Sequence, residues 1–260
     1  MKFQWNKQYT DAVLIALTVI FPIILSNNPI GDDYVRLYNG IDYSGGGRWF
    51  ASWLLQILSA DKFIFNIFPL SQILGIVIYA ISLSWIVQKI SITNRFSSAL
   101  IILLSLTYPF VFQNYSYQYD CLTMLLALSI FSITPFIFIP QTQNRKEWIR
   151  CSLYKIILIL LGLLFYQPVL VSFIIFSIFI YLFYQSVQYK HKVLFWHAAL
   201  LIIAYLIDYF IILSFSDTGY YKRRSFFMFS LIIENIIDNS KDIMLYIAPY
   251  YKNKIGRAHV

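Results

Sequence analysis

Two adjacent aspartates and two arginines stand in a short polar segment between long apolar ones. Residues 28–49 read NPIGDDYVRLYNGIDYSGGGRW and contain Asp32, Asp33, Arg36 and Arg48. A carboxylate can take the proton of an attacking hydroxyl group, and a guanidinium group can hold phosphate oxygens with paired donors. These residue types suit the transfer of a sugar from a lipid phosphate to a hydroxyl. One carboxylate suffices there, because phosphate leaves as a stable anion and needs no acid.

The same residues also have purely structural explanations. Asp32 and Asp33 could lie in a solvated turn, and Arg48 could anchor a helix by extending to the membrane surface. We favour a site because Arg36, Gly47 and Arg48 follow the pair closely. The two aspartates cannot be ranked: one is expected to orient and the other to react. Two carboxylates with no third acidic partner make a poor site for a hard metal ion, so we predict no required metal and no cofactor.

A short amphipathic helix is predicted directly after the glycine run. Residues 48–63 read RWFASWLLQILSADKF. Apolar residues recur there at helical spacing, at Trp49, Trp53, Leu54, Ile57 and Leu58, and are interrupted by Ser52, Gln56 and Ser59. This pattern indicates a helix that lies in the plane of the membrane interface.

The composition is that of a membrane protein. Of 260 residues, 59% are hydrophobic and only 12% are charged. Apolar runs long enough to approach the roughly 30 Å of a bilayer core occur near residues 11–27, 63–88, 96–112, 121–139, 151–166, 169–184 and 196–215. We therefore predict an all-α, polytopic transmembrane helical bundle with the bilayer as its main partner.

Charge in the connecting segments alternates along the chain. One set of connections carries the basic residues Lys2, Lys7, Lys89, Arg95, Arg145, Lys146, Arg150, Lys155, Lys190 and Lys192. The other set carries Asp32, Asp33, Asp42, Asp61 and Asp120 against Arg36, Arg48 and Lys62. The positive-inside rule then places the N-terminus in the cytoplasm and the aspartate pair outside. The net charge of +8 is explained by topology, so no nucleic-acid partner is expected.

Further candidates lie at the same predicted outer side. Tyr34 and Trp49 could stack on sugar rings, although an aromatic belt at the interface explains them equally well. Asp120 could face the same cavity or cap the helix that follows, and Gln167 could meet the acceptor or bond exposed carbonyls. Asp208 lies within an apolar run, where a carboxylate usually faces a cavity or a partner, or else it is simply interfacial.

The order of these features resembles one known family. A helix, an outer loop with two aspartates, an arginine, and then GR-W before an amphipathic helix is similar to the glucosyl transferase family of phage serotype conversion, which belongs to the GT-C class. Two later segments are similar too: YPFVFQNYSYQYDCLTMLLAL at 108–128 and LFYQPVLVSF at 164–173. The resemblance covers most of residues 10–215.

This resemblance implies a multi-pass enzyme of the bacterial inner membrane. It would take glucose from a polyprenyl-phosphate carrier and add it to O-antigen or another surface glycan. The family's acidic pair matches Asp32 and Asp33, its arginine matches Arg36, and its Gly-Arg pair matches Gly47 and Arg48. The alternative is a transporter or flippase of lipid-linked sugars, which would be expected to place charged groups and broken helices near mid-membrane.

We expect one membrane glycosyltransferase domain over residues 1–254, incomplete at its C-terminus. Residues 216–254 predict amphipathic helices on the outer side. The final residues, 255–260, read IGRAHV, which one reading frame of a widely used sequencing adapter encodes, so we expect them to be a non-native tail.

Overall fold

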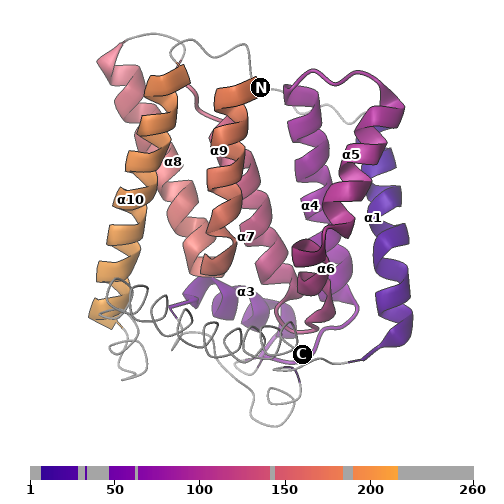
Figure 1. The fold of residues 1–260 in the computed structure, drawn as a ribbon. Coiled ribbons are helices and arrows are strands. Elements are labelled where there is room, and N and C mark those ends of the chain that lie inside the picture. Colours follow the sequence, from indigo (N-terminus) through magenta and orange to yellow (C-terminus); the bar gives the residue numbers. More distant parts are fainter. Residues whose placement is uncertain are drawn as a thin grey trace, which may run out of the picture. The chain divides into compact units, whose positions relative to one another are not determined.

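The computed structural model describes residues 7–28, 33, 47–61, 64–140, 144–183 and 190–215. Within these residues there are helices and connections and no strand. The α-helices are α1 (Lys7–Ser26), α3 (Trp49–Ser59), α4 (Leu70–Lys89), α5 (Arg95–Thr107), α6 (Pro109–Ser116), α7 (Cys121–Ile133), α8 (Arg145–Phe165), α9 (Val171–Phe183) and α10 (Lys190–Phe215). Two short 3₁₀-helices are η2 (Thr134–Phe136) and η3 (Gln167–Leu170). The predicted all-α bundle is confirmed (Figure 1).

The chain divides into two compact units, residues 1–211 and residues 212–260. The site and the packing described below belong to the first unit. The amphipathic helices predicted for 216–254 and the tail at 255–260 lie outside the described residues.

The described helices are those of a multi-pass membrane protein. Four are long and apolar enough to span a bilayer by themselves, namely α1, α4, α8 and residues 191–212 of α10. The pair α5 and α6, bent by 59° at its break, can form a fifth span. Two further apolar helical segments, residues 121–136 and 167–183, are shorter. All seven apolar runs predicted from the sequence therefore form helices, although only some reach full length.

Several predicted boundaries were wrong, because apolar length does not mark where a helix starts. The run predicted from residue 63 becomes helical only at Leu70. The run predicted from residue 151 begins at Arg145, because the Asn144 side chain accepts the Lys146 N–H and caps the helix. The run at 96–112 breaks at Tyr108, since a residue before proline disfavours helical backbone.

The core lies where α7 packs against α4 and α8. Two glycines allow this close approach. A Cβ atom added at Gly75 of α4 would lie 2.9 Å from Leu125 Cδ1, and one added at Gly162 of α8 would lie 2.7 Å from Phe131 Cζ. Small residues at such contacts let helix backbones pack closely in a membrane.

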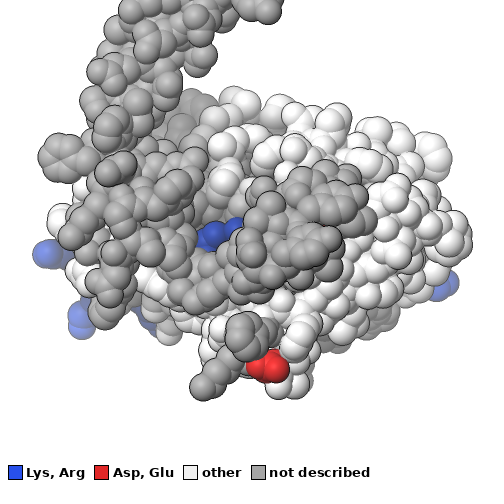
Figure 2. Space-filling view, turned by 90° about the horizontal axis from the view of Figure 1, so that it is seen from below, with Lys and Arg blue, Asp and Glu red and all other residues white. Residues whose placement is uncertain are grey.

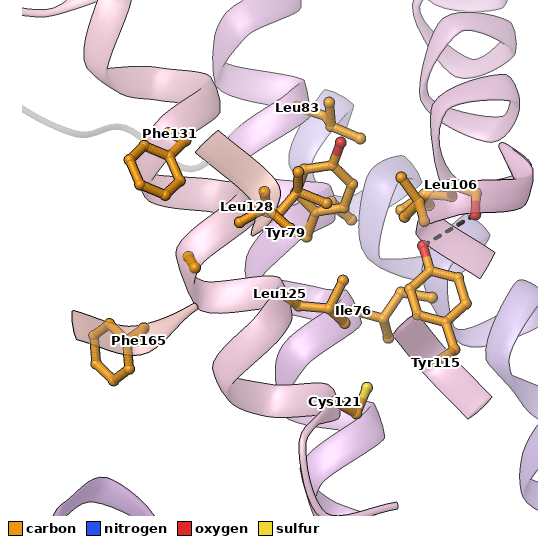
Figure 3. Packing of buried hydrophobic residues seen from close by; sticks show 14 of the residues in the cluster. Ile76, Tyr79, Leu83, Leu106, Tyr115, Cys121, Leu125, Leu128, Phe131 and Phe165 are labelled. Atoms are coloured by element: carbon orange, nitrogen blue, oxygen red, sulfur yellow. Dashed lines mark hydrogen bonds between the residues drawn. The ribbon is translucent and has the colours of Figure 1, made fainter. Parts of the chain in front are cut away.

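The broken helix pair is tied back to the same core. Figure 3 shows Leu106 of α5 and Tyr115 of α6 beside the side chains of α4 and α7. The Tyr115 hydroxyl donates a hydrogen bond of 3.0 Å to the Leu106 carbonyl. This bond satisfies one of the carbonyls that the end of α5 leaves without a helical partner.

Helix α3 lies across one end of the bundle (Figure 1) and packs against α8. Its buried side consists of Ala51, Ser52 and Leu55, while Trp53 and Ile57 are 60% and 55% exposed. The predicted helix is thus present, and its position in the membrane interface stays a prediction. Ser52, predicted as a polar interruption of the apolar face, lies on the buried side of the helix instead.

One basic residue departs from the predicted charge pattern. The sequence assigns Lys155 to the basic connections, but the structure buries it halfway along α8. Its Nζ donates to the Pro135 carbonyl at 3.1 Å and lies 2.6 Å from His197 Nε2 of α10. The Trp196 ring centroid is 4.7 Å from Nζ. Lys155 therefore joins α8 to α10 inside the bundle and does not mark a cytoplasmic loop.

Candidate functional site

Asp33 is completely buried and its carboxylate is hydrogen-bonded to backbone. Oδ2 accepts the N–H of Gln118 at 2.9 Å, and Oδ1 accepts the N–H of Tyr119 at 3.3 Å. A residue of a solvated turn would be exposed, so that explanation is wrong for Asp33. The carboxylate instead fixes the segment after α1 to the turn between α6 and α7.

That turn is held from several other directions. The Gln118 side chain donates to Asn27 Oδ1 at 3.3 Å and accepts from Asn66 Nδ2 at 2.6 Å. Ser71 and Gln72, at the start of α4, donate to the carbonyls of residues 118 and 117 at 2.8 Å and 3.2 Å. The turn that carries Asp120 therefore has a fixed position relative to α1, α4 and Asp33.

Gly47 places the next functional side chain. Its φ is 71°, in the left-handed region that residues with a Cβ rarely adopt. Arg48 follows directly at the N-cap of α3. Gly47 therefore has the left-handed backbone directly before the arginine.

The Arg48 side chain points into the bundle, with 14% of its surface exposed. Its Nε donates to the Phe165 carbonyl at 2.9 Å, and its Nη2 donates to Thr123 Oγ1 at 3.2 Å. Its Nη1 lies 3.5 Å from Asp120 Oδ2, and its Cζ lies 4.8 Å from the centroid of the Tyr166 ring. An arginine that extends to the membrane surface would make none of these contacts, so that explanation is wrong.

Asp120 occupies the N-cap position of α7 but makes no capping hydrogen bond with its side chain. The side chain is 3% exposed and forms the ion pair with Arg48. The capping explanation is therefore wrong, and the alternative that Asp120 faces the same cavity as the aspartate pair stays a prediction. We call Asp33, Arg48, Asp120, Thr123 and Tyr166 the outer-end cluster, after the side of the membrane that the sequence predicts for this end.

The other predicted site residues divide into two groups. Trp49 is half-buried at the first position of α3, next to Arg48. Gln167 donates from Nε2 to Asp208 Oδ2 at 3.2 Å, a partner that the sequence does not suggest. Asp32, Tyr34 and Arg36 lie outside the described residues.

Sequence analysis missed Thr123 as a partner of Arg48. A signal for it exists, because residues three apart on a helix lie on the same face and Thr123 comes three positions after Asp120. The Phe165 carbonyl could not be found this way. It accepts from Arg48 only because α8 ends beside α7, which is a property of the packing.

The outer-end cluster combines two kinds of chemical group. A carboxylate can accept a proton from a hydroxyl group, and a guanidinium group can bind phosphate oxygens. Figure 2, a view onto this end, shows basic atoms near its centre. Among the described residues, no three His, Cys, Asp or Glu side chains gather at metal-binding distances.

Comparison with known proteins supplies the family. Residues 21–256 match the family described as glucosyl transferase GtrII. Over 140 residues the chain is 33% identical to an uncharacterised 55.3 kDa protein in the gtrB 5′ region of Salmonella phage P22. That alignment covers 53% of this chain and 29% of the phage protein. No solved structure matches. With a family match across most of its length, this chain belongs to the glucosyl transferase GtrII family.

Proposed function

We propose that this protein transfers glucose from a polyprenyl-phosphate carrier to O-antigen or another surface glycan. The observation that carries the proposal is the outer-end cluster, which holds carboxylates and a guanidinium group together at one end of a membrane bundle. Membership of a glucosyl transferase family supports the sugar. The reaction would be of the inverting GT-C type and would need no nucleotide sugar, metal or cofactor.

The aspartate pair divides into two roles under this proposal. Both oxygens of Asp33 accept backbone N–H groups, so Asp33 is suited to hold the loop and the 117–120 turn in place. A general base must come within hydrogen-bonding distance of the acceptor hydroxyl, and Asp33 is completely buried with both oxygens bound to backbone. We therefore assign the general base to Asp32 and positioning to Asp33.

The proposed reaction is a single displacement. Asp32 takes the proton of the acceptor hydroxyl while the oxygen of that hydroxyl bonds to C1 of glucose. The bond from C1 to the phosphate oxygen breaks, and polyprenyl phosphate leaves as an anion. Arg36 and Arg48 would stabilise that anion, with Tyr34 and Trp49 packing on the sugar.

The arrangement of charge supports a membrane orientation. The connection between α4 and α5 and the beginning of α8 carry Lys89, Arg95, Arg145 and Lys146, while Asp33 and Asp120 lie at the opposite end. Basic connections are enriched on the cytoplasmic side. We propose that the protein lies in the bacterial inner membrane with its N-terminus in the cytoplasm and the outer-end cluster on the periplasmic side.

A transporter or flippase of lipid-linked sugars is the second candidate. It is favoured by the buried contact between Lys155, halfway along α8, and His197 of α10. The broken pair α5 and α6 also favours it. Transporters place polar groups and interrupted helices at this depth. We rank it below the transferase because of the family match and the outer-end cluster.

The deciding experiment measures glucose transfer in membranes from cells that express the complete open reading frame containing this sequence. The donor is labelled polyprenyl-phosphate glucose. We expect Asp32→Asn to abolish transfer, and Asp33→Asn to reduce both transfer and the thermal stability of the protein, because it weakens the hold on the 117–120 turn. Full transfer by Asp32→Asn would exclude Asp32 as the base.

The same membranes test the transporter alternative and the prediction that no metal is required. Movement of the labelled donor across vesicles without transfer to an acceptor would favour the transporter. Full transfer in excess chelator is expected. Loss of transfer that manganese restores would contradict the metal-free mechanism.

A further inference from the structure

Asp208 lies on the buried face of α10. The buried residues of this helix in the first unit follow a helical spacing, at Val193, His197, Leu200, Ala204 and Asp208. Residues spaced by three and four positions share one side of a helix. Asp208 therefore faces the bundle and not the lipid, with 1% of its surface exposed. The alternative of a merely interfacial carboxylate is wrong.

The carboxylate of Asp208 is only half satisfied. Oδ2 accepts a hydrogen bond from Gln167 Nε2 at 3.2 Å. Oδ1 is buried and has no hydrogen-bond partner among the described residues, and none of the described lysines and arginines forms an ion pair with Asp208. A buried carboxylate oxygen without a donor destabilises the folded protein. Such an atom calls for a donor that is supplied by something else.

The contact with Gln167 does not explain why the residue is an aspartate. An asparagine side chain offers the same carbonyl oxygen to Gln167 without a buried charge. An aspartate differs in offering a second strong acceptor oxygen. Hydroxyl groups of a sugar are donors of the kind that this acceptor would bind.

A short segment connects Asp208 to the outer-end cluster. Arg48 binds the Phe165 carbonyl and lies over the Tyr166 ring. The next residue, Gln167, reaches Asp208. The last residue of α8 and the two residues that follow it thus contact Arg48 on one side and Asp208 on the other.

We propose that Asp208 is a sugar-binding residue of this site, whose Oδ1 accepts a hydrogen bond from a hexose hydroxyl. Gln167 is the positioning residue that holds the carboxylate. The proposal rests on the proposed function. The hydroxyl belongs either to the glucosyl donor or to the glycan acceptor, which share this chemistry, and the experiment separates the two.

The test pairs a residue change with the removal of a substrate hydroxyl. Asp208→Asn keeps an oxygen for Gln167 and replaces the free acceptor with an amide. Wild type and Asp208→Asn are assayed with two substrate series, polyprenyl-phosphate deoxyglucoses and deoxy acceptor glycans. For the hydroxyl that Asp208 binds, either change alone should lower kcat/KM by about 10- to 100-fold, and the two together should cost no more than one.

Each result decides the proposal. If Asp208→Asn causes no further loss of kcat/KM once one donor hydroxyl has been removed, Asp208 binds the donor. If this holds for an acceptor hydroxyl instead, Asp208 binds the acceptor. Independent, multiplying losses with every deoxy substrate would overturn the proposal and leave Asp208 a structural residue. Tyr209→Phe, at the adjacent position of α10, is the control and should behave as wild type.

Two further measurements keep the test decisive. If Asp208→Asn does not accumulate in membranes, Asp208→Glu is compared instead, because it keeps the charge and displaces the oxygen by one methylene. If wild type transfers no glucose, the proposed function fails. Binding of polyprenyl-phosphate glucose and of the glycan by calorimetry then tests Asp208 alone, and equal affinities for wild type and Asp208→Asn overturn the proposal.

Discussion

At the scale of single residues, Arg48 organises the described part of the site. Its guanidinium group contacts a carbonyl, a hydroxyl, a carboxylate and an aromatic ring at the same time. Only a planar group with several donors in a fixed arrangement can do this. The chemistry of arginine, and not its charge alone, is therefore required at this position.

We expect Arg48→Lys to lower glucose transfer by about 100-fold or more, because an ammonium group cannot keep the contacts with Phe165 and Thr123 together, and each hydrogen bond to a charged group is worth about 1.5–3 kcal/mol. The measurement is transfer per amount of inserted protein. Arg95→Lys is the matched control, since Arg95 also pairs with a carboxylate, Asp11, but is largely exposed. Equal activity of both variants would show that Arg48 serves only as a positive charge.

At the scale of elements, α10 is attached to the rest of the first unit by polar contacts at two depths. His197 meets Lys155 of α8, and Asp208 meets Gln167 of η3. Helices in a bilayer gain little from apolar contact with each other, because lipid is equally apolar. Polar contacts and close packing therefore decide where α10 sits.

This attachment predicts that the effects of Lys155 and His197 substitutions on stability are strongly non-additive. Lys155→Met or His197→Leu alone leaves the other polar group buried without its partner, and should lower the melting temperature in detergent. The double variant removes both groups and should be less destabilised than the sum of the two, with a coupling of about 1–3 kcal/mol. Additive effects would mean that the two side chains do not depend on each other.

At the scale of the whole molecule, the asymmetry of charge predicts which end faces the cytoplasm. Thr93, between α4 and α5, and Asp61, after α3, are exposed at opposite ends of the first unit. The native cysteines, Cys121 and Cys151, are both buried. Single cysteines introduced at 93 and 61 can therefore report the orientation.

We expect Asp61→Cys to react with a membrane-impermeant maleimide in intact spheroplasts, and Thr93→Cys to react only after lysis. The reason is the bias of basic residues toward the cytoplasmic side. The unmodified protein is the control for the two buried cysteines. The reverse pattern would invert the proposed topology and place the outer-end cluster in the cytoplasm, where a periplasmic acceptor could not reach it.

The sequence alone determined the class of protein and the approximate position of its helices, but not where each helix begins or breaks. Composition, seven apolar runs and the family-like order of DD, R and GR-W needed no tertiary information, because bilayer thickness and helical spacing act on contiguous residues. The left-handed backbone at Gly47 is also a local property, because glycine adopts it far more readily than other residues.

Only the tertiary structure decided what the polar side chains contact. Asp33 binds backbone 85 positions away, Arg48 binds the end of α8 117 positions away, and Lys155 lies inside the bundle instead of in a basic connection. These partners come from different helices that meet only when the bundle packs. The local sequence pattern carries no information about contacts between distant helices. Once the helices pack, the cost of burying an unpaired polar group makes these contacts specific.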